Sequence, residues 1–310
     1  MTGPTVVRPE TDFNAAAHAY ALRGEKLPGI STISKMGETE TWGIASAWAF
    51  KIGVNGAAKV LGVDPGELRA KLQKAGLTPW ATRDKAAERG NWVHDVLEGL
   101  GQSGEIPDLS KFSAEVQGHA RAVLRWYLDY RPSFVSTEVQ VVSEKHRFAG
   151  RYDIRCHLRH IKELGPPIPP PDPGWLALVD LKTSKDVYPT QHFAQLEGYE
   201  LASVEMGFPR TDVRYVLNTK PDGTYKFVRS WANGDHFLAY LSAHNAVLDI
   251  QSKDPEVART AEREVDILGQ LPSRFKDLTS DLEPGPLGGL LRSMQKRGLV
   301  GCSKGLWSRL

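Results

Sequence analysis

The sequence predicts an α/β protein in which a mixed central β-sheet is flanked by helices and preceded by a helical N-terminal region. Two observations predict this class. Through the first third of the chain, apolar residues recur at helical spacing between cap signals. From residue 137 to residue 231, short strand-like runs surround one further helical segment. Because strands interleaved with helices build a sheet with helices packed on it, the two patterns together indicate one layered core.

The N-terminal region is expected to be helical after an irregular arm over residues 1–30. Tryptophans and alanines have helical spacing between residues 38 and 59. Asp64 and Thr78 are each followed directly by proline, which is a start signal for a helix. A further helix is predicted over residues 113–130, where an Arg-Pro pair ends it.

The central part of the chain changes to strand-like patterns. Strands are expected over residues 137–144, 146–158 and 175–184, and over a hairpin of 212–220 and 224–231. The proline-rich insert 162–174 cannot join a ladder, because prolines lack the N–H donor, and we expect an exposed linker there. A helix over residues 190–206 separates the last single strand from the hairpin.

Three regions follow from this order. Residues 1–110 form the helical N-terminal region, residues 111–255 the core, and residues 256–310 a C-terminal helix with a basic flexible tail. After Glu283 the chain has basic residues but no acidic one, so the tail could meet phosphates. A solvated tail or a segment that docks on a partner is the alternative.

Composition limits the classes of function. The 310 residues are 41% hydrophobic with a formal net charge of +2, so contacts with nucleic acid would come from local patches. No apolar run could cross a membrane, and the start of the chain lacks a signal peptide's pattern. We therefore expect a cytoplasmic protein with no membrane partner. Its two cysteines are too few for a four-cysteine metal or iron–sulfur site.

A carboxylate and an amine project from one face of the predicted strand 175–184, because Asp180 and Lys182 are two residues apart. Asp153 lies in the preceding predicted strand, so the two carboxylates become neighbours if these strands pair. Such a pair suits Mg²⁺ or Mn²⁺, and the main-chain carbonyl of Leu181 could add a ligand. The metal would activate water and stabilise phosphate charge, while Lys182 orients that water or neutralises the developing charge. The set indicates metal-assisted phosphodiester hydrolysis.

The same charges have a simpler interpretation, which is an ion pair at a strand end. The pair would be Asp153 with Lys182, or Asp180 with Arg151. Charged side chains among apolar strand residues are costly unless something binds them, and this cost favours the metal site.

Other polar side chains could complete a site. His94, in the helix that begins after Thr78, could ligate a metal, although a lone helical histidine is more often a core or surface residue. Gln195 and Tyr199 are four residues apart and share a helix face. They could contact a phosphate and a base, or be an exposed glutamine and a tyrosine at the core edge.

Three residues at strand ends are open to two interpretations each. Glu138 could be a further carboxylate near the metal or an ordinary exposed glutamate. Thr183 and Ser184 follow Lys182 directly, so they could donate to a phosphate or cap the turn.

Taken together, these residues resemble the PD-(D/E)XK nuclease superfamily, specifically its RecB-like, phage-type exonuclease branch. The resemblance rests on His94 in a helix, GRYD ending at Asp153, DLK from Asp180 to Lys182, and QLEGY from Gln195 to Tyr199, in the family's order. LPGISTIS from Leu27, with Trp48 downstream, is also similar to the N-terminal segment of phage-type members. The matched region covers residues 85–231.

The resemblance implies a restriction-endonuclease-like core with Asp153, Asp180 and His94 as metal ligands. It implies Lys182 as the catalytic lysine, and Gln195 and Tyr199 as residues that position the DNA strand. Two departures stand out. CRISPR-associated relatives hold an iron–sulfur cluster with four cysteines, so no such cluster is expected here. The insert after the Asp153 strand is longer and richer in proline than a tight hairpin.

We therefore expect a Mg²⁺- or Mn²⁺-dependent deoxyribonuclease, an exonuclease rather than an endonuclease. It would act in DNA recombination, repair or phage DNA processing in a bacterial or phage-infected cell. DNA is the expected partner, and the sequence leaves open a homo-oligomer or a recombination partner protein. One alternative is a nucleic-acid-binding or scaffolding module whose catalytic site is idle. Another is a metal-independent structural protein in which the charges form ion pairs.

Overall fold

A computed structural model describes residues 11–14, 19–37, 42–105, 108–161, 171–253, 273–274, 290–291, 294, 300–303 and 306–309. The chain divides into two compact units. The first contains residues 1–13 and 18–241, and the second contains residues 14–17 and 242–310. The first unit thus unites nearly all of the expected N-terminal region with nearly all of the expected core. All the candidate site residues belong to it.

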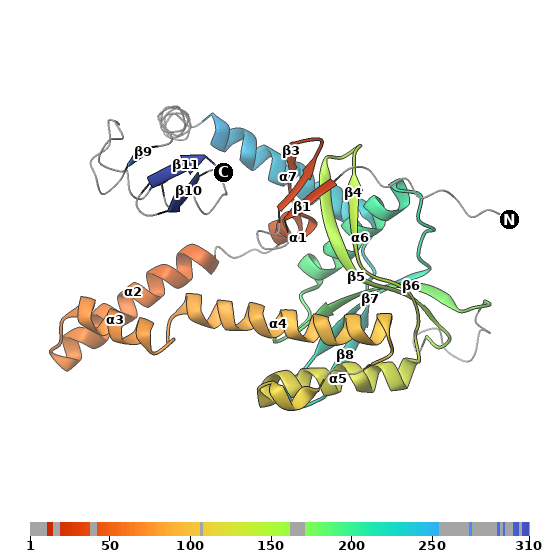
Figure 1. Ribbon diagram of the computed structural model, residues 1–310, viewed down its shortest axis with the longest axis horizontal. Coiled ribbons are helices and arrows are strands. Elements are labelled where there is room, and N and C mark those ends of the chain that lie inside the picture. Colours follow the sequence, from red (N-terminus) through yellow and green to blue (C-terminus); the bar gives the residue numbers. More distant parts are fainter. Residues whose placement is uncertain are drawn as a thin grey trace. The chain divides into compact units, whose positions relative to one another are not determined.

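The first unit is built on a five-stranded sheet with the strand order β4-β5-β6-β7-β8 (Figure 1). Its strands are β4 (Ser133–Ser143), β5 (Phe148–Leu158), β6 (Trp175–Lys182), β7 (Val213–Thr219) and β8 (Tyr225–Arg229). Strands β6 and β7 are parallel, while every other neighbouring pair in this sheet is antiparallel. The predicted mixed sheet is therefore confirmed, and the condition for bringing Asp153 and Asp180 together is met, because their strands β5 and β6 pair.

The described residues contain seven α-helices, which are α1 (Ile30–Ser34), α2 (Trp42–Leu61), α3 (Pro65–Lys74), α4 (Pro79–Gln102), α5 (Ala114–Tyr130), α6 (Pro189–Glu205) and α7 (Gly234–Ser252). Of these, α3 and α4 begin where the sequence places its proline-marked cap signals. The Asp64 carboxylate accepts the N–H of Glu67 at 2.9 Å, and Thr78 Oγ1 accepts the N–H of Ala81 at 3.2 Å. Both side chains satisfy a backbone donor of the first helical turn, which fixes the start of α3 and α4.

Helices cover both faces of the five-stranded sheet. On one face, α4 and α5 pack through residues such as Val93 and Trp126 against Ile154 and Val179. On the other face, α1, α6 and the start of α7 pack against β5, β6 and β7. The sheet is thus the middle layer of three, as Figure 1 shows for α4 and α5 below it and α6 above.

One segment that was expected to be irregular forms strands instead. In the N-terminal arm, β2 (Ala19–Leu22) pairs with β3 (Glu25–Leu27), and β1 (Thr11–Asn14) joins them. Arg23 and Gly24 between them have φ values of 52° and 82°, which suit a two-residue hairpin turn. This hairpin gives little sequence signal, because its two strands are only four and three residues long.

The second unit contains the end of α7 and a small sheet with the order β10-β11-β9. Its strands are β9 (Ser273–Arg274), β10 (Val300–Ser303) and β11 (Leu306–Arg309). Strands β10 and β11 pair in antiparallel fashion within the region expected to be a basic tail, and the flexibility of that tail stays a prediction. The helix expected after Asp254 and the insert up to residue 170 lie outside the described residues.

Candidate metal centre

Strand β4 is distorted at Glu138, opposite Asp153. Thr137 pairs with Ile154 and Val139 pairs with Tyr152, so this register sets Glu138 level with Asp153. Glu138 has a φ of 51°, in the left-handed region that favours glycine. Holding a glutamate there costs on the order of 1–3 kcal/mol, and strain of this kind concentrates at functional sites.

The pleat of β5 also changes at Asp153. Phe148 and Tyr152 pack in the core beneath α6, whereas Ile154 and Cys156 pack in the core beneath α4 and α5. In a regular strand, residues separated by an even number share one face. The side chains of β5 therefore switch faces at Asp153.

Strands β5 and β6 separate at the same level. Their ladder ends with Ile154 opposite Val179, so the next residues along the two strands are Asp153 and Asp180. In place of a further backbone pair, Asp153 Oδ2 accepts the N–H of Leu181 at 2.6 Å. The carboxylate thus fills the opening between the strands and is fixed by β6 itself.

His94 of α4 meets the two carboxylates of this opening. Its Nδ1 lies 3.4 Å from Glu138 Oε1 and 3.5 Å from Asp153 Oδ1. One donor atom from each of the three residues lies within 4.8 Å of the others. Two ligands about 2.1 Å from one cation are at most ~4.2 Å apart, so small shifts would bring all three donors onto one ion. Glu138 belongs to the cluster and is not an exposed strand-end glutamate.

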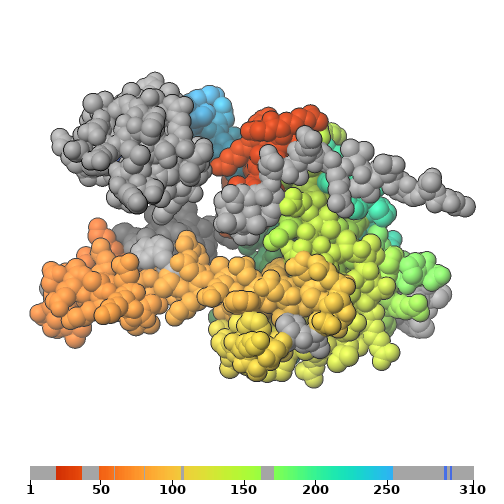
Figure 2. Space-filling model, viewed as in Figure 1, coloured from red at the N-terminus to blue at the C-terminus, as the bar shows by residue number. Residues whose placement is uncertain are grey.

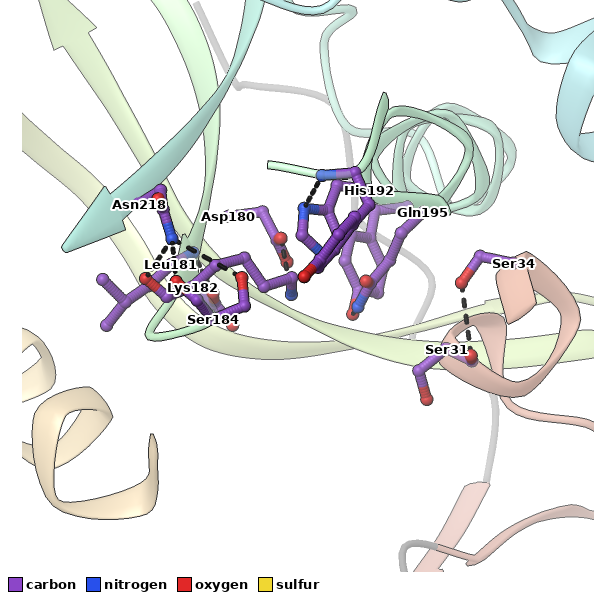
Figure 3. Close-up of polar contacts among 12 residues, drawn as sticks. Ser31, Ser34, Asp180, Leu181, Lys182, Ser184, His192, Gln195 and Asn218 are labelled. Carbon is purple, nitrogen blue, oxygen red and sulfur yellow. Dashed lines mark hydrogen bonds and ion pairs between the residues drawn. The ribbon is translucent and has the colours of Figure 1, made fainter. Parts of the chain in front are cut away.

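Asp180 and Lys182 form a second, adjoining pair (Figure 3). Lys182 Nζ lies 2.6 Å from Asp180 Oδ2, as their shared strand face predicts. The ammonium and the carboxylate form a charged pair, and the buried Oδ1 atom of Asp180 has no hydrogen-bond partner among the described residues. Asp180 is only 1% exposed. It lies outside the three-residue cluster, so its predicted role as a ligand beside Asp153 and His94 gains no support from that grouping.

The ionisable groups of the centre shift one another's pKa. Burial raises the pKa of Asp180 to about 6, and the Asp153 charge adds to this rise while Lys182 opposes it. Burial also raises the pKa of Asp153, against the opposing charges of His94 and Lys182. Burial alone would lower the pKa of His94, but Asp153 and Glu138 outweigh it and hold that pKa above its usual value.

Carboxylates outnumber the fixed cations of the centre. Arg151 Nε lies 2.9 Å from Glu138 Oε2, and Lys182 contacts Asp180. The ion pairs offered as an alternative, Asp153 with Lys182 and Asp180 with Arg151, are therefore not the ones formed. Three carboxylates face two permanent positive charges, and His94 adds a third only when it is protonated. With His94 neutral, as a metal ligand must be, the excess of negative charge suits a cation.

Helix α6 closes the site with a buried polar pair. Gln195 Nε2 donates to Tyr199 Oη at 2.7 Å, and both residues are buried, so the exposed glutamine of the alternative interpretation was wrong. Burial, and then the charges of Asp180 and Asp153, hold the pKa of Tyr199 well above its usual value. A Cβ on Gly150 would lie 2.8 Å from Tyr199 Cε1 and 2.6 Å from Ile30 Cδ1. Only glycine lets this tyrosine lie so close to β5.

The end of β6 is held by side chains of β7 that the sequence analysis missed (Figure 3). Asn218 Nδ2 donates to the carbonyls of Ser184 at 2.9 Å and Lys182 at 3.3 Å. Thr219 Oγ1 also donates to Lys182 O at 3.3 Å and lies 2.8 Å from His119 Nδ1. The parallel register that pairs Lys182 with Asn218 leaves no local sequence signal.

The residues after Lys182 form a turn. Ser184 Oγ donates to Asp186 O at 2.7 Å, which favours the capping interpretation of Ser184. The Thr183 carbonyl accepts Arg89 Nη2 at 3.5 Å, while contact of its hydroxyl with a phosphate stays a prediction, as does the Leu181 carbonyl as a ligand.

His192 of α6 is a further buried group beside the Asp180–Lys182 pair (Figure 3). Its Nδ1 accepts the N–H of Tyr188 at 3.2 Å. Burial, reinforced by the Lys182 charge, lowers the pKa of His192 to about 3. The imidazole is therefore neutral at physiological pH, and the sequence offered no reason beyond proximity to single it out.

No protein-family model matches the chain, and the curated proteins contain no significant match to it. Within the described residues, none of the helices has the length and apolar character needed to span a bilayer.

Proposed function

We propose that the protein is a divalent-metal-dependent nuclease that hydrolyses phosphodiester bonds of DNA. The single observation that carries the proposal is the convergence of His94, Glu138 and Asp153, from three different elements, beside the Asp180–Lys182 pair. The PD-(D/E)XK resemblance stated from the sequence supplies DNA as the substrate class. An exonuclease with the restriction-endonuclease-like core fits that resemblance.

The donor set fits Mg²⁺ or Mn²⁺. Carboxylate oxygens suit both ions, and one imidazole nitrogen suits Mn²⁺ as well. The Oδ1 atom of buried Asp180 favours the same conclusion, because it has no hydrogen-bond partner among the described residues and a buried carboxylate oxygen of this kind is costly unless a cation or proton compensates it. His94, Glu138 and Asp153 would hold the ion, with Asp180 at its edge.

When bound, the ion would lower the pKa of a water molecule and polarise the scissile phosphate. Lys182 carries a fixed positive charge beside Asp180, and this charge can neutralise the negative charge that develops on the phosphate. Asp153 links the centre to β6 through Leu181 N–H, while Asn218 fixes the backbone that carries Lys182. Gln195 and Tyr199 close the site toward α6 and would position the strand.

The test is hydrolysis of end-labelled linear DNA by the purified full chain, with Mg²⁺, with Mn²⁺ and with EDTA. We expect metal-dependent release of nucleotides and a loss of at least about 100-fold in rate for Lys182→Met, the effect of removing one stabilising donor. Closed circular DNA in the same assay distinguishes an endonuclease, which nicks the circle, from an exonuclease, which leaves it intact.

Lys71→Met is the matched control, because Lys71 pairs with Glu67 on the exposed surface of α3 and its removal should leave the rate unchanged. Equal rates for wild type and Lys182→Met, or degradation that persists in EDTA, would refute the proposal. Tight DNA binding without hydrolysis in either metal would instead support the idle binding module.

A further inference from the structure

A groove separate from the metal centre is lined by residues of α4, of the start of α5 and of the segment just before α5. The segments that form α4 and α5 lie side by side (Figure 2). The volume of the groove is about 540 Å³, within the range of pockets that hold small ligands. Basic and aromatic side chains dominate its lining: Lys85, Arg89, Trp92, Lys111 and Phe112. None of them serves the hydrolytic roles described above.

An aromatic pair forms one wall of the groove. The rings of Trp92 and Phe112 have centroids 5.0 Å apart and are tilted by 53°, so the phenylalanine supports the indole without covering it face to face. Trp92 is 41% exposed. A large, supported and half-exposed indole offers a surface on which a nucleic-acid base can stack, and every base has such a face.

Positive side chains surround the indole. Lys85, Arg89 and Trp92 are spaced four and three residues apart on α4, so they lie along one helix face. Lys111 stands at the opposite edge with its side chain 77% exposed, and it makes only a long 3.9 Å contact with Asp108. Two lysines on either side of a stacking surface can contact the phosphates that flank one base.

Arg89 connects the groove with the candidate metal centre. Its Nη1 pairs with Glu115 Oε1 at 2.7 Å within the groove, and its Nη2 donates to the carbonyl of Thr183 at 3.5 Å. Thr183 directly follows Lys182 in the chain. Arg89 therefore contacts both the lining of the groove and the segment that follows Lys182, so the groove adjoins the end of β6.

We infer that this groove binds one unpaired nucleotide of a DNA single strand, with its base on Trp92 and its phosphates beside Lys85 and Lys111. The inference rests on the proposed nuclease function and adds a second contact to it. A base inside a duplex has both faces covered by neighbouring base pairs and cannot stack on the indole, so the exposed face of Trp92 favours a single strand over a duplex.

The test measures binding of a fluorescein-labelled oligothymidylate to the full chain in EDTA, so that no hydrolysis intervenes. Trp92→Ala should weaken the affinity about 5- to 100-fold, the effect of removing one base–aromatic stack, and Trp92→Phe should restore most of it. Trp231→Ala is the matched control, because Trp231 is 72% exposed and lies outside the groove lining. Its affinity should equal that of the wild type.

Lys111→Gln gives a second readout that does not depend on the packing of Trp92. It should make the dependence of log affinity on log salt concentration shallower by about 0.7, the value for one phosphate contact of a single strand. Absence of single-strand binding by the wild type, or wild-type affinity in Trp92→Ala, would overturn the inference.

The outcomes for the two proposals are distinguishable. Wild-type hydrolysis with unchanged binding by Trp92→Ala overturns the groove while the nuclease stands. Binding that depends on Trp92 without metal-dependent hydrolysis supports the groove and removes the nuclease.

Discussion

The carboxylate of Asp153 accepts the backbone N–H of Leu181 at 2.6 Å, one residue beyond the last ladder pair of β5 and β6. One side chain therefore has two roles, because it replaces a ladder hydrogen bond and contributes a donor atom to the cluster with His94 and Glu138. The two roles can be separated experimentally.

Asp153→Asn keeps an oxygen that can accept the Leu181 N–H but loses the negative charge. We expect near-wild-type stability and a loss of metal-dependent hydrolysis for this variant. Asp153→Ala should lose hydrolysis and also about 1–3 kcal/mol in the free energy of unfolding, because it leaves the buried N–H of Leu181 unpaired. Urea unfolding and the DNA assay measure the two effects, and hydrolysis by Asp153→Asn at the wild-type rate would contradict the metal role.

Asn218 is expected to act as a positioning residue for Lys182. Asn218→Ala removes the donor to the carbonyls of Lys182 and Ser184, so kcat should fall while the KM for DNA changes little. The free energy of unfolding should fall by about 1–3 kcal/mol, because buried carbonyls lose their partner.

Ser230→Ala is the control for Asn218→Ala. It removes a comparable buried bond, from Ala232 N–H to Ser230 Oγ, away from Lys182. If both variants lower kcat equally, the effect of Asn218 is one of stability alone.

Gly150 should be intolerant of a methyl group. In Gly150→Ala, the new Cβ would lie 2.6 Å from Ile30 Cδ1 and 2.8 Å from Tyr199 Cε1, and overpacking of this kind costs about 1–3 kcal/mol. The melting temperature and the hydrolysis rate should both fall, because Tyr199 must move. Gly53→Ala in α2 meets no atom within 4 Å and should stabilise the helix by about 0.5–1 kcal/mol. Equal stabilisation by both variants would contradict this packing.

Stability should depend on the neutral form of His119. Burial, with the nearby Arg89 charge, lowers the pKa of His119 from 6.5 to about 4. Between these two pH values, the unfolded chain therefore binds a proton on His119 that the folded chain does not bind. The stability contributed by neutral His119 is complete above pH 6.5 and is lost as the pH falls toward 4.

Urea unfolding from pH 7 to pH 4 tests this dependence. In His119→Asn, the free energy of unfolding should fall less steeply as the pH decreases, because the contribution of one proton to the slope is removed. His160→Asn, at an exposed position, is the control substitution. An unchanged slope in His119→Asn would contradict the assignment.

Local patterns predict the elements of the first unit well. The proline-marked helix starts at Asp64 and Thr78, and the shared face of Asp180 and Lys182, depend only on neighbours in sequence, and the structure confirms them. The position of Glu138 opposite Asp153 could also have been predicted from the sequence. The four-residue turn between Ser143 and Phe148 sets the hairpin register, and counting back along it brings Glu138 opposite Asp153.

Strand registers and contacts between residues far apart in the sequence cannot be predicted from such local patterns. The proline-rich insert hides the register of β5 against β6, so the offset between Asp153 and Asp180 follows only from the folded sheet. The parallel pairing of Lys182 with Asn218 depends on the crossover through α6. Nothing in the sequence of α4 indicates that His94 faces the opening in the sheet rather than the core beside it.

The most direct test of the central claim is the anomalous difference density of Mn²⁺ in crystals of the full chain. We expect one strong peak within bonding distance of His94 Nδ1, Glu138 and Asp153, and its loss in Asp153→Ala. Crystals with saturating Mn²⁺ that show no peak between these three side chains would contradict this claim.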